Sequence, residues 1–468
     1  MSIETIIEAG VKAFKEQMVS LLSDIVEDEL TPVLAHTVTL GIQQAIAAAG
    51  GGAFRAFVES KETAADAVRH EGALYRFKYA SDKTFGTLWG RQTITRRVYQ
   101  NASDTKTCVP LDAAWGMAGE TLTVEVREAV AFACAHVTPE EAYALLKKSA
   151  LFQPHPTQMK EVVTRLGQMV EKREEELNRR IQEAEAMPEG VRVLAASMDG
   201  ANVLMREPGA KRGRPAERPI DRTQSEDTAY RNAMAGTVSV YGAVPEGEKR
   251  PQRLQTRYVS HMPEDKAVTF KGKFERELAA AEAQLPPDAV KVLICDGARS
   301  LWKYAKNNKR FDEYEKLVDY WHTLEHLSLA AEALFGKSTQ EATDWYDRYA
   351  DKLLEEDDGA ARVLRSMDYH ARTLRLTPAR RKDFNRQRVY FVNNGARMHY
   401  AEFRRRGLPI GSGPVEAACK SLIKTRMCRS GMRWSKDGGQ AVLDLRTYVK
   451  SNRWDSFWKH INELKMVA

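Results

Sequence analysis

The sequence predicts a mixed α+β protein that is divided into several domains. Its 468 residues are enough for two to four domains, at roughly 150 residues per domain. The spacing of apolar residues changes along the chain from helical periodicity to strand-like alternation and back. A hydrophobic content of 43% with 8% aromatic residues supports a folded core and excludes an intrinsically disordered chain.

The first third of the chain is predicted to be mainly helical. Apolar residues recur at helical spacing through residues 2–58, and we expect this segment to end in a flexible run at Gly50, Gly51 and Gly52. Alternating patterns at residues 74–79 and 93–99 predict a small β-rich element. The helical pattern returns from Leu122 onwards.

The middle of the chain reads as a sheet with one helix between its strands. A buried strand at residues 191–198 ends at Asp199, and another at residues 290–295 ends at Asp296, each before a glycine. Further elements are strands at 237–241, 254–259 and 317–321 and a helix at 267–284. Three strands, a helix and a fourth strand form the opening order of an RNase H-like core.

The last part reads as helical, with no strand signal between residue 322 and about residue 385. A loop rich in turn residues, 408–414, then opens a helix that carries Glu416 in its first turn. The expected organisation is a helical N-terminal segment suited to oligomerisation (1–60), a small β-rich subdomain (61–120), a helix-turn-helix-like DNA-binding region (121–187), the first part of the RNase H-like core (188–321), an all-helical insertion (322–400) and the C-terminal helices of the core (401–468).

Three acidic residues, Asp199, Asp296 and Glu416, are the candidate catalytic and metal-binding residues. Hydrolysis of a phosphodiester needs an activated water and a stabilised leaving oxygen, and two Mg²⁺ ions about 4 Å apart supply both. Hard cations prefer carboxylate oxygens on rigid supports. Aspartates at the ends of two neighbouring strands, with a glutamate on an adjacent helix, would provide them.

Each of these residues also has an ordinary structural interpretation. An Asp-Gly step after a strand is a turn signal, and a glutamate in the first turn of a helix is favoured by the helix dipole. The spacing alone leaves both interpretations open.

Several longer motifs resemble one family of mobile-element enzymes. Residues 393–400 (NNGARMHY), 407–420 (GLPIGSGPVEAACK) and 429–435 (RSGMRWS) look like the C-terminal signature of the ISKra-type bacterial insertion-sequence transposases, which are Mutator-like. Residues 198–201, 206–209, 230–234 and 295–298 resemble the earlier blocks of that family. The resemblance covers about residues 191–458 and is poor over the first hundred residues.

The resemblance implies a DDE transposase with an RNase H-like core, in which Asp199, Asp296 and Glu416 fall on the acidic triad. Such an enzyme uses two Mg²⁺ ions, for which Mn²⁺ substitutes, to nick DNA at the element ends and to join the 3′-hydroxyl to target DNA. Its expected partners are double-stranded DNA, as terminal inverted repeats and target, and further copies of itself. The alternatives are an RNase H-fold nuclease or domesticated transposase, and a catalytically silent DNA-binding regulator.

Two histidines, His322 and His326, lie one helical turn apart. Mutator-like transposases have an aromatic-His element after the second aspartate, which makes His322 a candidate neighbour of the active site. His326 is expected to serve packing or a phosphate contact. Ordinary core or surface histidines remain the alternative for both.

The C-terminal part carries a strong positive charge. Between residues 372 and 436 basic residues outnumber acidic ones by 17 to 3, which is typical of a polyanion-binding surface. The candidate phosphate contacts are Lys420, Lys424, Arg426, Arg429 and Arg433. Trp434 is either a base-stacking residue or a core tryptophan.

Two further segments are candidates for DNA binding. Lys211, Arg212 and Arg214 form a short motif that resembles an AT-hook, although a solvated basic loop fits equally well. The helices at 138–149 and 157–170 resemble a helix-turn-helix, with Lys160 and Arg165 on the exposed face of the second helix. Their connection is longer than usual, so two plain helices of a helical domain are the alternative.

The remaining features indicate an intracellular protein. Five scattered cysteines without a CxxC pair argue against a zinc ribbon or a disulfide framework. No stretch approaches about 20 uninterrupted apolar residues, and Glu4 and Glu8 stand where a signal peptide carries basic residues. We therefore expect a cytoplasmic, nucleoid-associated bacterial protein with no membrane partner.

Overall fold

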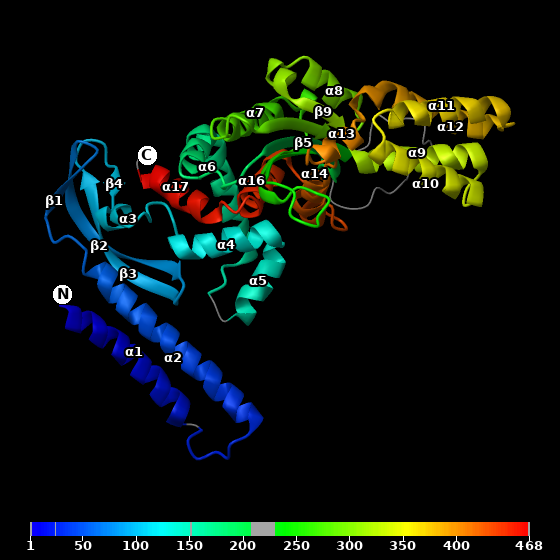
Figure 1. Ribbon diagram of the computed structural model, residues 1–468. Coiled ribbons are helices and arrows are strands. Elements are labelled where there is room, and N and C mark those ends of the chain that lie inside the picture. Colours follow the sequence, from blue (N-terminus) through cyan, green and yellow to red (C-terminus); the bar gives the residue numbers. More distant parts are fainter. Residues whose placement is uncertain (1, 24, 150–151, 207–229, 467–468) are drawn as a thin grey trace, which may run out of the picture. The chain divides into compact units, whose positions relative to one another are not determined.

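The computed structural model describes residues 2–23, 25–149, 152–206 and 230–466 (Figure 1). The chain forms two compact units, Met1–Arg173 with Trp458–Ala468, and Glu174–Phe457. The structure is mixed α+β with two sheets, as the sequence predicts. Lys211, Arg212 and Arg214, the AT-hook-like residues, lie outside the described residues.

A helical hairpin opens the first unit. Its helices are α1 (Ile3–Ser23) and α2 (Pro32–Glu59). Thr31 caps α2, since its side chain accepts a hydrogen bond of 3.1 Å from the backbone N–H of Leu34. By length and composition α2 could cross a membrane, and 11% of its apolar stretch is buried.

The prediction of a flexible glycine run at the end of this segment is wrong. Gly50, Gly51 and Gly52 lie inside α2. A Cβ on Gly52 would lie 2.8 Å from the carbonyl oxygen of Ala9 in α1, and one on Gly50 would lie 2.6 Å from the ring of Trp89. The glycines therefore allow close packing on two sides, and that packing outweighs their low helix propensity.

A four-stranded antiparallel sheet follows, in the order β1-β2-β3-β4. Its strands are β1 (Ala67–His70), β2 (Ala73–Thr87), β3 (Gly90–Asn101) and β4 (Thr107–Cys108). The two long strands contain the two predicted alternating segments, which confirms that prediction. Phe85 and Ile94 are fully buried and pack with Leu111 and Met117 in a small core.

The remaining helices of this unit are α3 (Pro110–Ala114), α4 (Val124–His136), α5 (Pro139–Lys148) and the first part of α6 (Pro156–Glu183). The predicted capping box at the start of α5 is present. The Thr138 side chain accepts from the N–H of Glu141 at 3.2 Å, and the Glu141 carboxylate accepts from the N–H of Thr138 at 3.0 Å. Arg173, the last residue of the unit before α6 continues, has non-helical φ and ψ angles.

The second unit is built on a five-stranded sheet in the order β7-β6-β5-β8-β9. The strands are β5 (Val193–Leu204), β6 (Tyr230–Tyr241), β7 (Arg253–His261), β8 (Val290–Cys295) and β9 (Glu315–Val318). The pairs β5–β6 and β6–β7 are antiparallel, whereas β5–β8 and β8–β9 are parallel. All five predicted strands are therefore present, four with shifted bounds.

Helices cover both faces of this sheet (Figure 1). On one face lies α7 (Val268–Glu282), whose Phe274 ring is so close that a Cβ on Gly236 would lie 2.6 Å from it. On the other face, Ala201 and Ala235 pack against helices from the C-terminal part of the chain. Because side chains alternate along a strand, odd-numbered residues 199–203 of β5 share this second face.

The rest of the unit is helical, including the predicted insertion. The elements are α8 (Arg299–Lys306), α9 (Tyr320–Phe335), α10 (Gln340–Glu355), α11 (Gly359–Thr373), α12 (Pro378–Asn394), α13 (Tyr400–Arg405), α14 (Gly413–Ala418), a π-helix (Cys419–Lys424), α15 (Thr425–Met427), α16 (Lys436–Lys450) and α17 (Trp454–Met466), with short 3₁₀ turns at Asp265–Ala267, Lys309–Glu313 and Gly395–Arg397. The last residues of α17 belong to the first unit.

The predicted end of the first strand at Asp199 is wrong. β5 continues to Leu204 because every residue from Val193 to Leu204 pairs with β6. The Asp199-Gly200 step is therefore extended backbone in the middle of a strand, and the turn interpretation fails for this residue.

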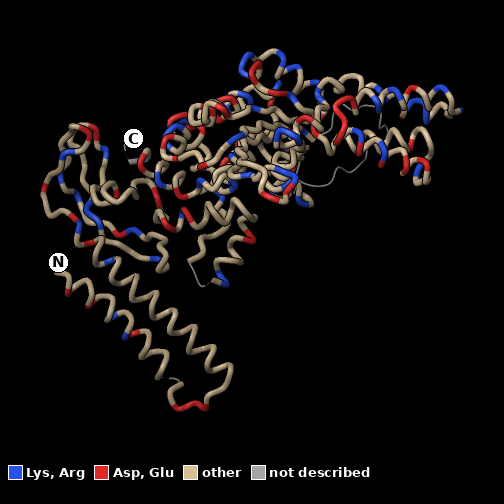
Figure 2. Tube along the Cα trace, in the orientation of Figure 1, with Lys and Arg blue, Asp and Glu red and all other residues tan. Residues whose placement is uncertain are grey.

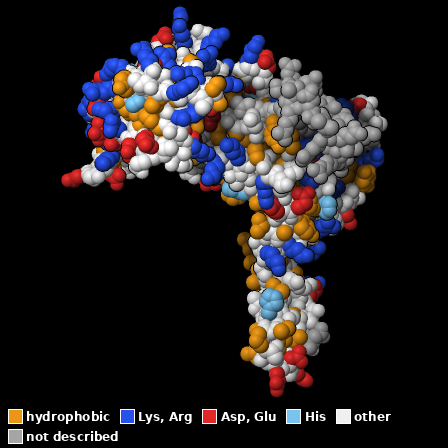
Figure 3. Space-filling model, turned by 90° about the vertical axis from the view of Figure 1, so that its right-hand side faces the viewer, with side chains coloured by type: hydrophobic (Ala, Val, Ile, Leu, Met, Phe, Trp, Pro, Cys, Tyr) orange, Lys and Arg blue, Asp and Glu red, His pale blue; other side chains and the backbone are white. Residues whose placement is uncertain are grey.

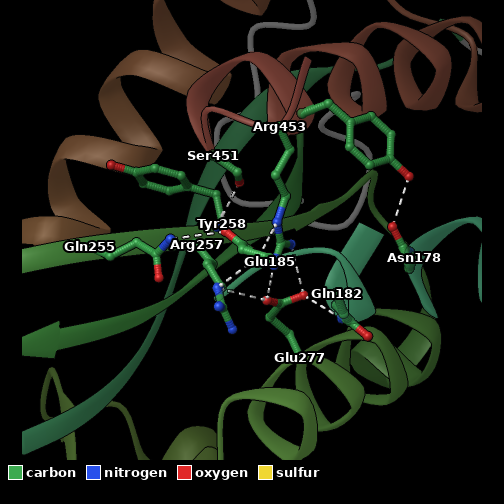
Figure 4. A network of polar contacts seen from close by, with 10 residues as sticks. Asn178, Gln182, Glu185, Gln255, Arg257, Tyr258, Glu277, Ser451 and Arg453 are labelled. Carbon is green, nitrogen blue, oxygen red and sulfur yellow. Dashed lines mark hydrogen bonds and ion pairs between the residues drawn. The ribbon is translucent and has the colours of Figure 1, made fainter. Parts of the chain in front are cut away.

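A buried ionic network ties helices and strands of the second unit together (Figure 4). The Arg453 guanidinium donates to Glu277 at 2.8 and 3.0 Å and to Glu185 at 2.5 and 3.0 Å. Arg257 lies 3.2 Å from Glu185. Burial alone raises the pKa of Glu277, but the charges of Arg453 and Arg257 and the hydrogen bonds from Arg453 and Gln182 together outweigh it and hold that pKa below its usual value.

A second buried group of charges lies next to this network. Lys273 contacts Glu174 at 2.6 Å and Asp444 at 3.6 Å, and Gln440 donates to Asp444 at 2.7 Å. Burial raises the pKa of Asp444 to about 6, and the positive charge of Lys273 limits the rise. Both groups line one cavity of about 450 Å³.

Candidate metal centre

Two of the three predicted carboxylates lie at the same distance along the chain beyond the last paired residues of two neighbouring parallel strands, Asp199 within β5 and Asp296 directly after β8. Ala196 of β5 pairs with Leu293 of β8, and three residues further along lie Asp199 and Asp296. Burial raises the pKa of Asp296, and the negative charge of Asp199 raises it further. The two carboxylates are therefore close enough to repel each other, which is the situation that a bound cation relieves.

A third aspartate, which the sequence analysis missed, extends this row. Cys295 of β8 pairs with Val318 of β9, so Asp319 occupies the position on β9 that Asp296 occupies on β8. The signal was available, because Asp319 follows a short apolar run exactly as Asp296 does. The predicted strand at residues 317–321 hides Asp319 inside a strand, whereas the strand ends at Val318.

Asp319 is completely buried and caps α9. One carboxylate oxygen accepts from the backbone N–H of His322 at 2.8 Å, and the other accepts from the backbone N–H of Ser412. Both oxygens thus hold backbone groups. The residue fastens the loop before α14 to the start of α9.

Glu416, the third predicted carboxylate, lies just beyond that loop. The Ser412 hydroxyl donates to the Glu416 carboxylate at 3.2 Å, and His322 Nε2 lies 3.9 Å from the same oxygen. Burial by itself lowers the pKa of His322, but the carboxylates of Asp319, Glu325 and Glu416 outweigh it and raise that pKa. The predicted neighbour His322 is therefore in contact with a predicted catalytic residue.

Among the residues that the structure describes, one group of three has ligand atoms within 4.8 Å of one another, and it consists of Asp319, His322 and Glu416. Asp199 and Asp296 do not belong to it. We regard Asp319 as the supporting member of this group rather than a ligand, since both of its oxygens already accept backbone hydrogen bonds.

The environment of Cys419, at the start of the π-helix, links Asp199 to Glu416. Burial raises the pKa of the Cys419 thiol, and the charge of Asp199, a hydrogen bond to it and the charge of Glu416 raise it further. Asp199 lies on the sheet face that packs against this helix. Cys419 is therefore a neighbour that Asp199 and Glu416 share, whereas the charge of Asp296 interacts with Asp199 and His322.

A cavity of about 430 Å³ opens beside Asp296 and is also lined by His322 and His326. His326 stacks on the Tyr390 ring with 3.5 Å between ring centroids, and its Nδ1 lies 2.6 Å from the side-chain oxygen of Gln387. The predicted packing role of His326 agrees with these contacts. A Cβ on Gly297 would lie 2.3 Å from the Tyr390 ring, so glycine after Asp296 is needed for the close approach of α12.

The predicted DNA contacts of the first unit are exposed but paired with acidic residues. Lys160 lies 2.9 Å from Glu140, and Arg165 lies 3.3 Å from Glu120. A phosphate would have to compete with these carboxylates.

The predicted contacts near the C-terminus divide into two sets. Exposed side chains are Lys420, Lys424, Arg429 and Arg433. Arg426 is buried instead, with its guanidinium carbon 5.2 Å from the Trp434 ring centroid, so it offers no surface to DNA in this conformation.

Trp434 is half-buried. Its indole N–H donates to the carbonyl of Met427 at 2.9 Å, and its backbone pairs with Leu204 and Met205 at the end of β5. The core interpretation of Trp434 fits these contacts.

Two comparisons with known proteins gave no match. No protein-family model matches the chain, and no curated protein matches it either.

Proposed function

We propose that this protein is a DNA transposase that nicks DNA at the ends of a mobile element and joins the resulting 3′-hydroxyl to target DNA. The observation that carries the proposal is the proximity of Asp199 and Asp296, which each lie three residues beyond the last pair of the parallel strands β5 and β8 and whose charges repel each other. Glu416, held by Ser412 and beside His322, supplies the third carboxylate.

The order and direction of the strands support an RNase H-like core for this proposal. Three antiparallel strands are followed by α7 and then by two parallel strands, with β5 in the centre of the sheet. The all-helical insertion α9–α12 lies between the second and third carboxylates. This arrangement is what the resemblance to insertion-sequence transposases leads one to expect.

The donor set fits a hard divalent cation. Asp199, Asp296 and Glu416 would hold Mg²⁺ or Mn²⁺, which would activate water and stabilise the leaving 3′-oxygen. The raised pKa of Asp296 fits the same interpretation, because burial and the repulsion by Asp199 both disfavour its charge without a cation. Lys420 and Lys424, exposed just after Glu416, would contact the DNA backbone.

The test is nicking of supercoiled plasmid DNA, and of DNA that carries the sequences flanking the gene, with Mg²⁺ or Mn²⁺. Asp296→Asn and Glu416→Gln are expected to abolish nicking. The matched control is Asp265→Asn, which neutralises a carboxylate of the same unit that is 89% exposed. Nicking by Asp296→Asn at the wild-type rate would overturn the proposal. Nicking without strand transfer would favour a nuclease. DNA binding that does not depend on the metal, without nicking, would favour a regulator.

A further inference from the structure

A second pocket, which none of the three predicted carboxylates lines, lies beside the loop that precedes Glu416. It has a volume of about 480 Å³, which is within the range of about 300–1,000 Å³ typical of small-ligand sites. Trp321 forms one wall, and residues of the 408–414 loop form another. Trp321 is 46% exposed, which is unusual for so large an apolar side chain.

The charge of this pocket is entirely positive. Its lining includes Lys249, Arg250, Arg253 and Arg404, and no acidic residue is among the described residues that line it. No ion pair joins Lys249, Arg250 or Arg253 to a carboxylate within the described part of the chain. Lys249, Arg250 and Arg253 are exposed beside the aromatic wall and have no counter-charge among the described residues, and Arg404 donates to the carbonyl of Leu354.

Trp321 is held in place by its neighbours while one region of its ring stays open. A Cβ on Gly411 would lie 3.1 Å from the indole, so glycine at residue 411 lets the loop pack closely against the ring edge. The N–H of Tyr320 donates to the carbonyl of Ile410 at 3.1 Å. The guanidinium carbon of Arg250 lies 5.5 Å from the ring centroid, within the range of a cation–π contact.

We propose that this pocket binds a single unpaired nucleotide of the DNA substrate, with its base on Trp321 and its phosphates on the surrounding cations. An aromatic face with cations around it is the combination that proteins use for unpaired nucleotides, since every base can stack and every nucleotide carries a phosphate. A base that stacks on Trp321 takes the place of Arg250, whose guanidinium then moves to a phosphate.

The position of the pocket relates this binding to the candidate metal centre. Trp321 is adjacent in sequence to His322, which lies 3.9 Å from Glu416. The loop that lines the pocket also contains Ser412, which bonds both Asp319 and Glu416. A nucleotide on Trp321 would thus fix the strand next to the bond to be cut. The identity of the ligand rests on the proposed action on DNA, whereas the test below does not need catalysis.

The test compares full-length variants in the binding of a duplex with one unpaired 2-aminopurine nucleotide and of a blunt duplex, in EDTA to prevent cleavage. Wild-type protein should bind the unpaired-nucleotide duplex more tightly and quench its fluorescence. Trp321→Ala should weaken that binding about 5- to 150-fold, the equivalent of about 1–3 kcal/mol for stacking one base, and leave the blunt duplex unaffected. Trp321→Phe should retain most of the binding.

The matched control is Trp89→Ala, which removes a tryptophan of the first unit that is 41% exposed, and it should change neither affinity. Arg250→Ala should reduce the salt dependence by about one phosphate contact. Unchanged affinity and quenching in a folded Trp321→Ala protein would overturn the proposal, as would dAMP that competes as strongly as the unpaired-nucleotide duplex. If the protein nicks DNA with metal but Trp321→Ala binds the unpaired-nucleotide duplex like wild type, only the nucleotide pocket is contradicted. If binding of that duplex depends on Trp321 but the protein does not nick DNA, only the proposed catalysis is contradicted.

A different observation carries a second inference about the α1–α2 hairpin. Along α2 the first charged residue is Arg55, and Figure 2 shows few charged positions on the hairpin apart from its acidic tip. Apolar side chains are exposed along both helices (Figure 3), namely Ile3, Ile7, Val11, Val19 and Leu22 on α1 and Val33, Leu40, Ile42 and Ile46 on α2. An exposed apolar surface of this extent marks an interaction site.

We infer that this apolar surface is covered by the hairpin of a second copy of the chain, as a four-helix bundle. The charges at the centre of α1 are complementary about Gly10. Glu8 precedes it and Lys12 follows it, so two antiparallel copies of α1 bring Glu8 opposite Lys12, while Glu4 and Glu16 lie further from this centre. The same charges, with the acidic tip at residues 27–29, oppose insertion into a bilayer.

Sedimentation of the full-length protein over a range of concentrations tests this inference. Wild-type protein should sediment as a dimer or larger, and Ile7→Lys with Val11→Lys should shift it to monomer. Val268→Lys, which changes an apolar residue of the second unit that is 66% exposed, should leave the assembly unchanged. A double variant that associates like wild type overturns the inference. Monomeric wild-type protein that floats with phosphatidylcholine–phosphatidylglycerol vesicles overturns it too and identifies a membrane as the partner.

Discussion

Asp319→Asn is the substitution that most sharply tests the supporting role of the missed aspartate. The variant keeps the shape of the side chain but replaces one carboxylate oxygen with an NH₂ group. Both oxygens accept backbone N–H groups, at 2.8 Å from His322 and at close contact from Ser412. The new NH₂ group would therefore face one of these two backbone N–H groups, so that two donors meet inside a fully buried site.

The expected loss of stability follows from these contacts. A hydrogen bond to a charged group contributes about 1.5–3 kcal/mol, and the second bond weakens because its acceptor becomes neutral. Removal of the negative charge next to Asp296 offsets part of this loss, since Asp319 contributes to the raised pKa of Asp296. We therefore expect the free energy of unfolding to fall by about 2 kcal/mol.

Urea unfolding followed by tryptophan fluorescence measures this change. The control is Thr339→Ala, which removes a half-buried, neutral cap of α10 that accepts from Ala342 at 3.2 Å and should cost about 1 kcal/mol. Because Ser412 positions Glu416, the same variant should also nick DNA more slowly. An Asp319→Asn protein as stable as the control, with wild-type nicking, would refute the reasoning.

Three further predictions concern the second unit. Arg453→Met should lower the free energy of unfolding by about 3 kcal/mol, measured by urea denaturation, because it leaves the buried carboxylate of Glu277 with only partial compensation. The folded-state pKa of Asp444, about 6, exceeds the ordinary value, so its contribution to stability should fall as the pH rises from about 4 to 6, and Asp444→Asn should remove this dependence in unfolding measured at several pH values. Gly297→Ala should reduce nicking and stability together, because its Cβ would meet the Tyr390 ring at 2.3 Å.

Controls for these predictions come from the same unit. Arg362→Met breaks exposed ion pairs to Asp358 and Glu356, and it should lower the free energy of unfolding far less than Arg453→Met does. Equal losses for Arg453→Met and Arg362→Met would contradict the importance of burial. Parallel stability profiles of wild type and Asp444→Asn between pH 4 and 6 would contradict the raised pKa, and a fully active, stable Gly297→Ala would show that α12 can move away.

The strands of the second unit were predictable because each carries its own local signal. The run at residues 290–295 has the same bounds as β8, and Asp296 follows the end of that strand as predicted. The end of β5 was missed because an Asp-Gly step normally turns, whereas pairing with β6 keeps Gly200 extended. That pairing joins Gly200 to Met234, 34 residues further along the chain, which no local pattern encodes.

Packing decided the remaining differences. Gly50, Gly51 and Gly52 are poor helix formers by themselves, and they are helical because α1 and Trp89 approach them closely. Arg426 belongs to a basic run that suggests a solvated face, but it turns inwards to the ring of Trp434. Neither contact can be read from sequence spacing, since each depends on a partner placed by the tertiary fold.

Anomalous diffraction from crystals of the protein grown with Mn²⁺ tests the central claim most directly. The account predicts manganese within coordination distance, about 2.0–2.2 Å, of carboxylate oxygens of Asp199, Asp296 and Glu416. Manganese held by Asp319, His322 and Glu416 with the other two aspartates unliganded, or no manganese at either group, would contradict it.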